Sequence, residues 1–374
     1  MRHIQPELTE ELEKHFGDPT KVGSGQPFLV DNFRKLVEQT AKLSFKNKDH
    51  LLFYRGQTSE HKNKAGNSTF YPSIYRGDYL PLRELTHKFD ILEGASKELV
   101  NLFDTQKIEG HKELKRRKSI QWSVLQHYEV CHTPLLDFTH SLRVACSFAT
   151  MDKKNEYGYV FIFGLPYITN RISINSEHDL INIRLLSICP PTALRPYFQE
   201  GYLAGTDDIT DNFETKTELD FNNRLIAKFK IPNDSSFWGS GFNKIPEKSL
   251  YPDNDPIFDL CSQIKDIAVK ELNTGDIGDF LKAWAELEEI LVTMARHETQ
   301  RFLSVREATR LLFKQGTVSK ELLYHIDRLR NFRNILVHKP KEVTYGQIKD
   351  YLPTLTDLIK QIKKIKPAAN TGFA

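Results

Sequence analysis

The pattern of prolines and apolar residues changes near residue 257, and this change limits the fold more than any other feature of the sequence. From Ile257 onward, prolines are nearly absent until Pro340, and apolar residues recur at the spacing of one helix face. Before that point, short apolar runs such as 51–54 and 160–163 alternate with Gly, Pro and Asn, as in short strands mixed with helices. The sequence therefore predicts an α+β protein whose last third is all-α.

The last third predicts an antiparallel helical bundle. Turn signals at Asn273, Gly316 and Pro340 separate the expected helices. Those helices span about 257–273, 277–299, 303–314, 318–338 and 344–366. A stretch rich in Pro and Asn precedes them and marks the junction. We expect a helical N-terminal extension at 1–29, a mixed α/β domain at 30–256 and the bundle at 257–374.

Net charge says little about partners, because 52 Lys and Arg face 49 Asp and Glu. The bundle holds 19 basic and 15 acidic residues, so the small positive excess lies there. This excess is too weak for tight nonspecific binding of nucleic acid. Any specificity for nucleic acid would therefore come from a local site and from dimerisation.

Several features favour a cytoplasmic protein without metal. The N-terminus lacks the uninterrupted apolar core of a signal peptide, and the longest apolar run, 159–165, is far shorter than a membrane-spanning helix. No C-x-x-C pair occurs, so neither a zinc ribbon nor a dithiol motif is present, and free thiols are expected. The cysteines are Cys131, Cys146, Cys189 and Cys261.

The fourth predicted helix carries residues suited to phosphodiester cleavage. Arg330, Asn334 and His338 recur every fourth position and share one face. Arg333 lies about 140° around the helix from His338, so the two meet only in a groove that both border, which a symmetric partner could supply. An imidazole and a guanidinium can move protons and stabilise phosphoryl charge without a metal. The alternative is ordinary capping of a helix C-terminus.

The segment from Arg333 to His338 resembles the R-x4–6-H motif of HEPN domains, including a polar residue after the Arg. This resemblance implies a dimeric, metal-independent ribonuclease of a toxin or phage-defence system, with an antitoxin or phage-derived activator as a further partner. It implies that His338 is the acid/base, Arg333 stabilises the phosphate, Asn334 is a positioning group and Arg330 supports RNA contact. Some members of this family are inactive or serve as binding modules.

In the mixed domain, two short segments combine apolar runs with polar residues. Arg55 and Gly56 follow the run 51–54, where a glycine allows close approach of another backbone or a ligand. Asp137 follows two leucines, so its carboxylate should be partly buried and paired, with Arg55 or His127 as partner. A purely structural Arg–Asp clamp between strand and helix is the alternative. Thr139 or Ser141 can cap the helix that follows.

In their order, these segments resemble the FRG domain, which is named for its (F/Y)-R-G start. Here Arg55-Gly56 matches that start, and QHYEVCHTPLLDFT at 126–139 resembles the family block Q-H-Y-G-x-P-T-R-L-L-D-W-T. Segments 195–202 and 249–253 also resemble family landmarks, which extends the resemblance over about residues 30–265. Glu129 replaces the usual Gly, and Pro134 stands where an Arg is common.

More distantly, this layout resembles ADP-ribosyltransferase folds that bind NAD. The resemblance implies that Arg55 holds a pyrophosphate, that His127 and Tyr128 contact ribose or nicotinamide, and that Gln199 or Glu200 takes the position of the catalytic acid. A carboxylate is normally needed there. The expected pocket residues are Arg55, Gly56, Gln57, Gln126, His127, Tyr128, Asp137, Thr139, Arg195, Gln199 and Glu200.

The leading hypothesis is an FRG domain that senses a cue or nucleotide and controls a HEPN-like ribonuclease bundle, without a cofactor. One alternative is an ADP-ribosyltransferase-like enzyme that uses NAD in the FRG domain, with the bundle as dimeriser. Another is a binding protein without catalysis.

Overall fold

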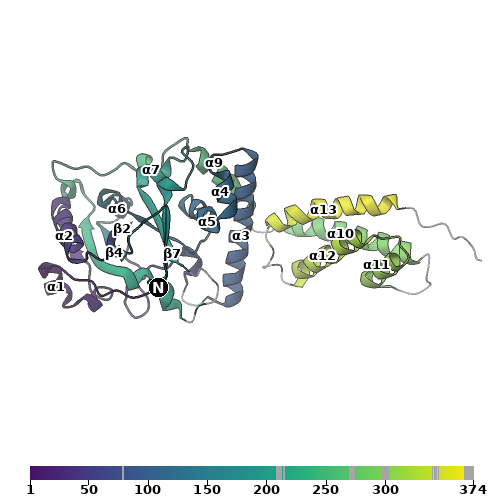
Figure 1. Cartoon of the computed structure of the whole chain (residues 1–374), viewed down its shortest axis with the longest axis horizontal. Coiled ribbons are helices and arrows are strands. Elements are labelled where there is room, and N and C mark those ends of the chain that lie inside the picture. The colour runs from purple at the N-terminus through teal and green to yellow at the C-terminus, as the bar shows by residue number, and fades with distance from the viewer. Residues whose placement is uncertain are drawn as a thin grey trace, which may run out of the picture. The chain divides into compact units, whose positions relative to one another are not determined.

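The computed structural model describes residues 1–77, 80–207, 213, 215–268, 274–296, 303–338, 340, 343 and 345–365. It divides into two compact units, Met1–Lys265 and Asp266–Ala374, which we describe separately. Figure 1 shows that the first unit contains a sheet with helices around it and that the second is helical.

The described strands of the first unit form one eight-stranded sheet in the order β1-β8-β4-β2-β3-β7-β6-β5. All neighbours are antiparallel except β1 and β8, which are parallel. The strands are β1 (Phe28–Leu29), β2 (Leu51–Gln57), β3 (Leu136–Thr139), β4 (Tyr157–Leu165), β5 (Ile172–Asn175), β6 (Leu180–Arg184), β7 (Gly201–Thr206) and β8 (Leu225–Pro232). The mixed α/β character expected of this part is confirmed.

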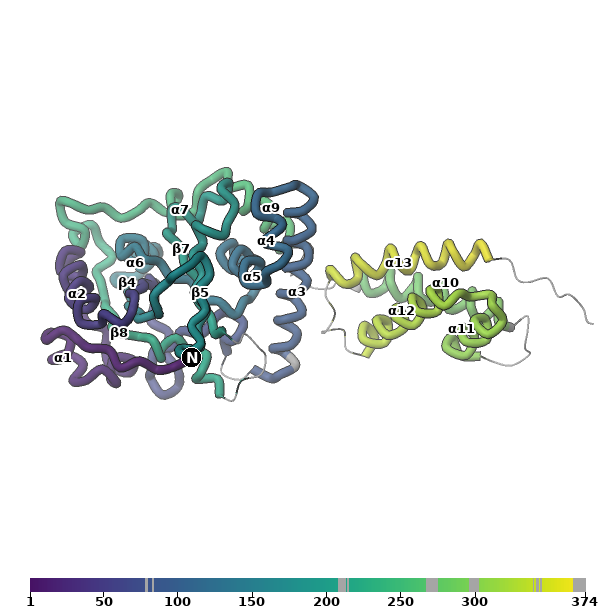
Figure 2. The backbone as a smooth tube through the Cα atoms, in the orientation of Figure 1, coloured from purple at the N-terminus to yellow at the C-terminus, as the bar shows by residue number. Residues whose placement is uncertain are grey.

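The helices of the first unit pack around this sheet, as the smooth trace in Figure 2 also shows. They are α1 (Glu10–Phe16), α2 (Phe33–Lys46), α3 (Leu82–Thr105), α4 (His111–Arg116), α5 (Lys118–His127), α6 (Leu142–Ala149), α7 (Arg195–Gln199), α8 (Glu247–Leu250) and α9 (Pro256–Ala268). The Ser141 side chain accepts a hydrogen bond from the Val144 N–H, so Ser141 caps α6, as the sequence predicts.

Helix α6 lies directly against the middle of the sheet because two glycines leave no side chain in the way. A β-carbon at Gly56 on β2 would overlap the carbonyl group of Ala145 and lie 2.8 Å from the Ala149 nitrogen. One at Gly158 on β4 would overlap the Ala149 carbonyl. The close approach predicted at Gly56 is therefore that of another backbone.

The first 29 residues are part of the main core. Ile4, Leu8, Leu12 and Phe16 are buried in the same apolar cluster as Phe53 and other sheet residues. Thr9 caps α1, and the Thr9 hydroxyl also donates to the buried Gln39 side chain on α2. The prediction of a helical extension holds only in part, because the helical residues of this segment are Glu10–Phe16 and the 3₁₀ turn Pro19–Lys21, and its apolar side chains are buried in the main core rather than projecting.

Helix α9 belongs to the first unit through Lys265, although its residues were expected to begin the bundle at 257. The Asp255 carboxylate explains this difference. It caps α9 by accepting from the Ile257 N–H, and its other oxygen accepts from the Tyr128 hydroxyl and the Arg195 N–H. The buried stripe of α9 is Ile257, Leu260, Cys261 and Ile264.

The second unit contains α10 (Thr274–Arg296), α11 (Val305–Lys314), α12 (Lys320–His338) and α13 (Tyr345–Lys364). These bounds agree with the predicted helices to within a few residues. The predicted positions 269–273, 297–299, 344 and 366 fall outside the described residues, whereas 303–304, 318–319 and 365 are described and are not helical. On α12, Phe332 and Leu336 are buried, but Ile335 is 42% exposed. No helix of the described residues is both long and apolar enough to cross a bilayer.

Candidate functional site

The candidate site lies where two central strands separate. β2 pairs with β4 along its whole length, but it pairs with β3 only at Tyr54 and Thr139. Beyond that point the Arg55 side chain takes over the hydrogen bonding, because its Nη1 donates to the main-chain oxygen of Asp137 at 2.5 Å. The guanidinium of Arg55 therefore lies on one side of the gap between β2 and β3, and Asp137 lies on the other.

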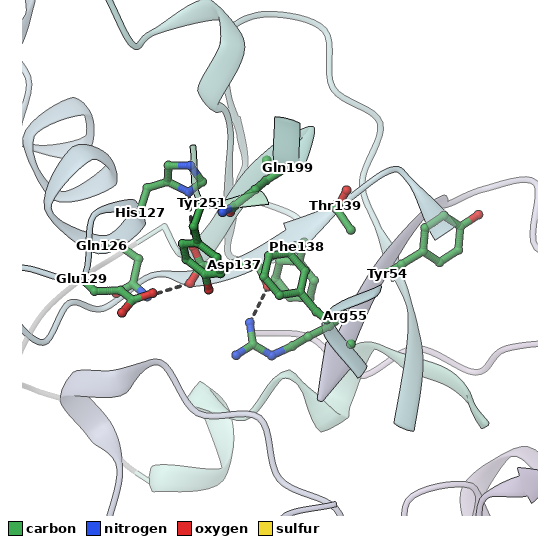
Figure 3. Close-up of a pocket in the computed structure, with 13 residues that line it drawn as sticks. Tyr54, Arg55, Gln126, His127, Glu129, Asp137, Phe138, Thr139, Gln199 and Tyr251 are labelled. Atoms are coloured by element: carbon green, nitrogen blue, oxygen red, sulfur yellow. Dashed lines mark hydrogen bonds and ion pairs between the residues drawn. The ribbon is translucent and has the colours of Figure 1, made fainter. Parts of the chain in front are cut away.

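A cavity of about 200 Å³ occupies this gap (Figure 3). In the figure, His127 and Gln199 approach from one side of Asp137, and Arg55 approaches from the opposite side. The lining residues are Tyr54, Arg55, Gly56, Gln126, His127, Glu129, Asp137, Phe138, Thr139, Phe148, Gln199, Gly201 and Tyr251. Seven residues of the predicted pocket thus come together around one cavity.

Asp137 has one more partner than the sequence indicates. The Gln126 Nε2 donates to its Oδ2 at 2.7 Å, and the His127 Nδ1 lies 3.9 Å from its Oδ1. The Gln126 amide is held in this orientation because its oxygen accepts from the Thr133 hydroxyl at 2.5 Å. Arg55 bonds the main chain rather than the carboxylate, so the carboxylate, 40% exposed, faces the cavity. This arrangement differs from a closed Arg–Asp clamp.

Arg55 retains unused hydrogen-bonding capacity. Its Nε is buried and has no hydrogen-bond partner among the described residues. Burial lowers the pKa of Arg55 to about 10, an effect that the Asp137 carboxylate opposes. A second, larger cavity of about 930 Å³ adjoins the first, and Arg55, Gly56 and Phe148 line both. The predicted residue Gln57 lines the larger cavity only.

Two further polar rings border the smaller cavity. The His127 side chain is 3% exposed, and its Nε2 has no hydrogen-bond partner. Tyr251, which lies in the predicted landmark 249–253, brings a phenol ring to the cavity. Burial raises the pKa of Tyr251 to about 12, and the carboxylate of Glu129 adds to this effect. The Tyr251 phenol can therefore act as a neutral group toward a ligand.

Three of the predicted pocket residues do not line either cavity. Tyr128 points to Asp255, where its hydroxyl donates at 2.8 Å. Arg195 is buried, and its guanidinium stacks on aromatic rings, the closest being Phe258 at 4.7 Å. Glu200 is exposed and ends α7 with a left-handed φ of 45°. Gln199 lines the smaller cavity, and its Nε2 donates to the Leu250 carbonyl.

Glu129 is the functional candidate that the sequence interpretation missed. It adopts a left-handed φ of 55°, a conformation that glycine adopts most readily, and it carries a carboxylate to the cavity. The sequence did contain a signal for this residue, because Glu129 stands where the FRG family block has Gly. The carboxylates at the cavity are thus Glu129 and Asp137 rather than Glu200.

In the second unit, the predicted catalytic residues lie on α12. Arg330 pairs with Asp327 at 3.0 Å, and the Arg333 Nη1 donates to the Asn334 side chain at 3.3 Å. Asn334 and His338 are exposed, whereas the Arg333 Nε is buried and unpartnered. Within the described residues of this chain, no hydrogen bond joins Arg333 to His338. The separation around the helix expected from the sequence is therefore retained in the fold.

Residues 50–158 match the family model of the FRG domain. The matched segment contains β2, α5, β3 and α6, and so supplies Arg55, Gln126, His127 and Asp137. It includes neither α7 nor the helices of the second unit. A search of curated proteins and a search of solved structures each give no match. The segment that matches the FRG model thus forms most of the cavity wall.

Proposed function

We propose that the FRG domain of this chain binds a nucleotide that carries a pyrophosphate, with NAD as the expected example. The observation that carries this proposal is Arg55, which lines two cavities and has a buried N–H that no group in the described part of the chain accepts. A guanidinium presents several N–H donors in a plane and binds phosphate oxygens in pairs. A bound phosphate would satisfy the donor that the fold leaves open.

The smaller cavity suits the sugar of such a ligand. The Asp137 carboxylate can accept hydrogen bonds from ribose hydroxyls, because Gln126 occupies only one of its oxygens. The aromatic rings of Tyr251 and Phe148 border the same space and offer apolar surface to a ring of the ligand. With about 200 Å³, this cavity holds part of a dinucleotide, and the remainder needs the adjoining cavity.

The same geometry favours cleavage of the N-glycosidic bond as the reaction. When that bond breaks, positive charge develops on the ribose ring, and a nearby carboxylate stabilises it. Asp137 is held ready for this role because its oxygen Oδ2 is fixed by Gln126 while Oδ1 stays near His127. Transfer of the ADP-ribosyl group to an acceptor, or to water, would follow.

Thermal melting with nucleotides tests the binding. Millimolar NAD should raise the melting temperature of the full chain, since a ligand that binds only the folded state stabilises it. Asp137→Asn should reduce this shift, because one acceptor oxygen for the ribose is lost, and should abolish release of nicotinamide, because the amide carries no charge to stabilise the ribose. An unchanged melting temperature with NAD and with ADP-ribose would contradict the proposal.

For the helical unit, we propose metal-independent RNA cleavage by a homodimer, as in a toxin or phage-defence effector that the FRG domain controls. Support comes from His338, which is exposed at the end of α12, and from the unpartnered Nε of Arg333. Tyr324 and Ile335 add exposed apolar surface to the same helix, at 63% and 42%. A second copy packed there would bury this surface and could bring its own Arg333 to His338.

A cleavage assay in the presence of a chelator tests this activity. Products with 2′,3′-cyclic phosphate ends are expected, and both Arg333→Ala and His338→Ala should abolish them. Arg328→Ala is the matched control, because this exposed arginine of α12 bonds Tyr351 instead. Equal cleavage or growth inhibition by all three variants would refute the proposed nuclease site.

A further inference from the structure

The larger cavity has a positive wall that the proposed ribose site does not use. Its volume is about 930 Å³, within the range of about 300–1,000 Å³ that is typical of ligand pockets. Four of its charged lining residues are basic and two are acidic, so positive charge is in excess. These residues are Arg55, Lys62, Arg76, Lys216, Asp152 and Glu247.

Two guanidinium groups face this cavity together. Arg76 follows the short 3₁₀ turn Ser73–Tyr75 and is anchored by its Nε, which donates to the Tyr71 carbonyl at 3.2 Å. Its positive charge lies near enough to Arg55 to add to the effect of burial in lowering the pKa of Arg55. Neither guanidinium forms an ion pair within the ranges that the structure describes. Two like charges held in one cavity favour an anion between them.

The loop that carries Lys62 adds a further uncompensated charge. The Lys62 Nζ lies 3.1 Å from the Oε2 of Glu60. The other oxygen of Glu60 is already taken by the fully buried Lys228, at 2.6 Å, and by the Ser68 hydroxyl. One carboxylate therefore serves two ammonium groups, which leaves about one positive charge at the cavity.

Gln57 indicates that a ligand of this cavity carries a hydrogen-bond donor as well as negative charge. Its side-chain oxygen is buried and has no partner within the ranges that the structure covers; Gln57 lies two residues beyond Arg55 on β2 and lines the same cavity. This oxygen requires a hydrogen-bond donor, and phosphate oxygens at neutral pH mostly accept. A sugar hydroxyl or a base amino group attached to the phosphates would supply it.

We propose that the larger cavity is the phosphate subsite, in which Arg55 and Arg76 together hold the pyrophosphate of a dinucleotide whose ribose faces Asp137. This inference rests on the proposed nucleotide binding and specifies the ligand's orientation. It also assigns Arg76 and Lys62 as binding residues that lie beyond the predicted set. A nucleoside without phosphates would lose both guanidinium contacts and should bind far more weakly than ADP-ribose.

Isothermal titration calorimetry with inorganic pyrophosphate and with ADP-ribose tests the inference on the full chain. Arg76→Gln should weaken both ligands by roughly tenfold or more, because each lost charge-assisted hydrogen bond accounts for about that factor. Arg76 is exposed, so the variant is expected to fold normally. Arg143→Gln is the matched control, since this arginine bonds the Asn243 carbonyl and lines neither cavity.

The outcomes separate the two proposals. If ADP-ribose binds equally to the wild type and to Arg76→Gln, the phosphate subsite is refuted and nucleotide binding stands. If pyrophosphate binds and depends on Arg76 while ADP-ribose and NAD do not bind, the anion site stands and the proposed function is refuted. Absence of binding by all three ligands would overturn both.

Discussion

Arg55 and Asp137 meet across the gap between β2 and β3, where the Arg55 Nη1 donates to the Asp137 main-chain oxygen at 2.5 Å. This contact replaces the backbone ladder that ends at Tyr54 and Thr139. Because this bond uses the main chain of Asp137, Arg55 does not bond the Asp137 carboxylate. The Arg55 Nε has no partner among the described residues. The candidate site therefore lies at the point where two central strands of the sheet separate.

Gly56→Ala should destabilise the first unit by about 3 kcal/mol, because a β-carbon there overlaps the backbone of α6, which cannot move without the helix. Urea unfolding measures the change. Gly94→Ala is the control, since Gly94 lies in the interior of α3 with nothing within 4 Å, and alanine should stabilise that helix by up to about 1 kcal/mol. Equal behaviour of the two variants would contradict the packing described for α6.

Glu129→Gly should raise stability slightly, by about 1 kcal/mol at most, because glycine adopts the left-handed φ of 55° without strain. Glu200→Gly is the matched control, with a φ of 45° at an exposed position away from both cavities. Both should gain similarly in melting temperature. Only the change at Glu129 should alter NAD affinity or turnover, and an equal effect at Glu200 would exclude a role for Glu129 in the cavity.

The pair formed by Glu60 and Lys228 should make stability sensitive to acid. Burial alone would raise the pKa of Glu60, but hydrogen bonds from Lys228 and Ser68 outweigh it, and the pKa lies below its ordinary value of 4.5. A lowered carboxyl pKa means that the pair's stabilisation is complete above about pH 4.5 and is lost as the pH falls through the folded pKa.

Glu60→Gln should therefore cost about 3–5 kcal/mol at pH 7, since it leaves the buried Lys228 charge without its counter-charge. The difference from the wild type should narrow as the pH falls below about 4.5. Urea unfolding over that range measures it, with Glu177→Gln as control, because the exposed pair of Arg2 and Glu177 should contribute less than about 1 kcal/mol. A difference that does not vary with pH would contradict this account.

Local patterns in the sequence predicted much of the fold. The helices of the second unit follow from apolar spacing, and the regularly spaced residues Ile348, Leu355, Leu358 and Ile362 of α13 are buried. The strand with Arg55 and Gly56, the helix that begins after Ser141, and the partial burial of Asp137 also follow from neighbouring residues. Each of these features is decided within one element or its cap.

Long-range contacts could not be predicted in this way. Tyr128 sits in a family block beside His127, yet its hydroxyl bonds Asp255, which is 127 residues later in the chain. The Asp255 carboxylate also caps α9, which belongs to the first unit. The boundary between the units therefore lies after Lys265 and not before Ile257. Arg76 and Tyr251 reach the cavities from distant segments, and only the folded chain brings them together.

Calorimetric titration of NAD into the wild type and into Arg55→Lys tests the central claim most directly. Lysine keeps the positive charge but loses the planar donors of the guanidinium. NAD should therefore bind the wild type, and Arg55→Lys, which should still fold, should bind NAD at least roughly tenfold more weakly. The Arg143→Gln control should bind as the wild type does. Equal NAD affinity in all three proteins, or no binding to the wild type, would contradict the account.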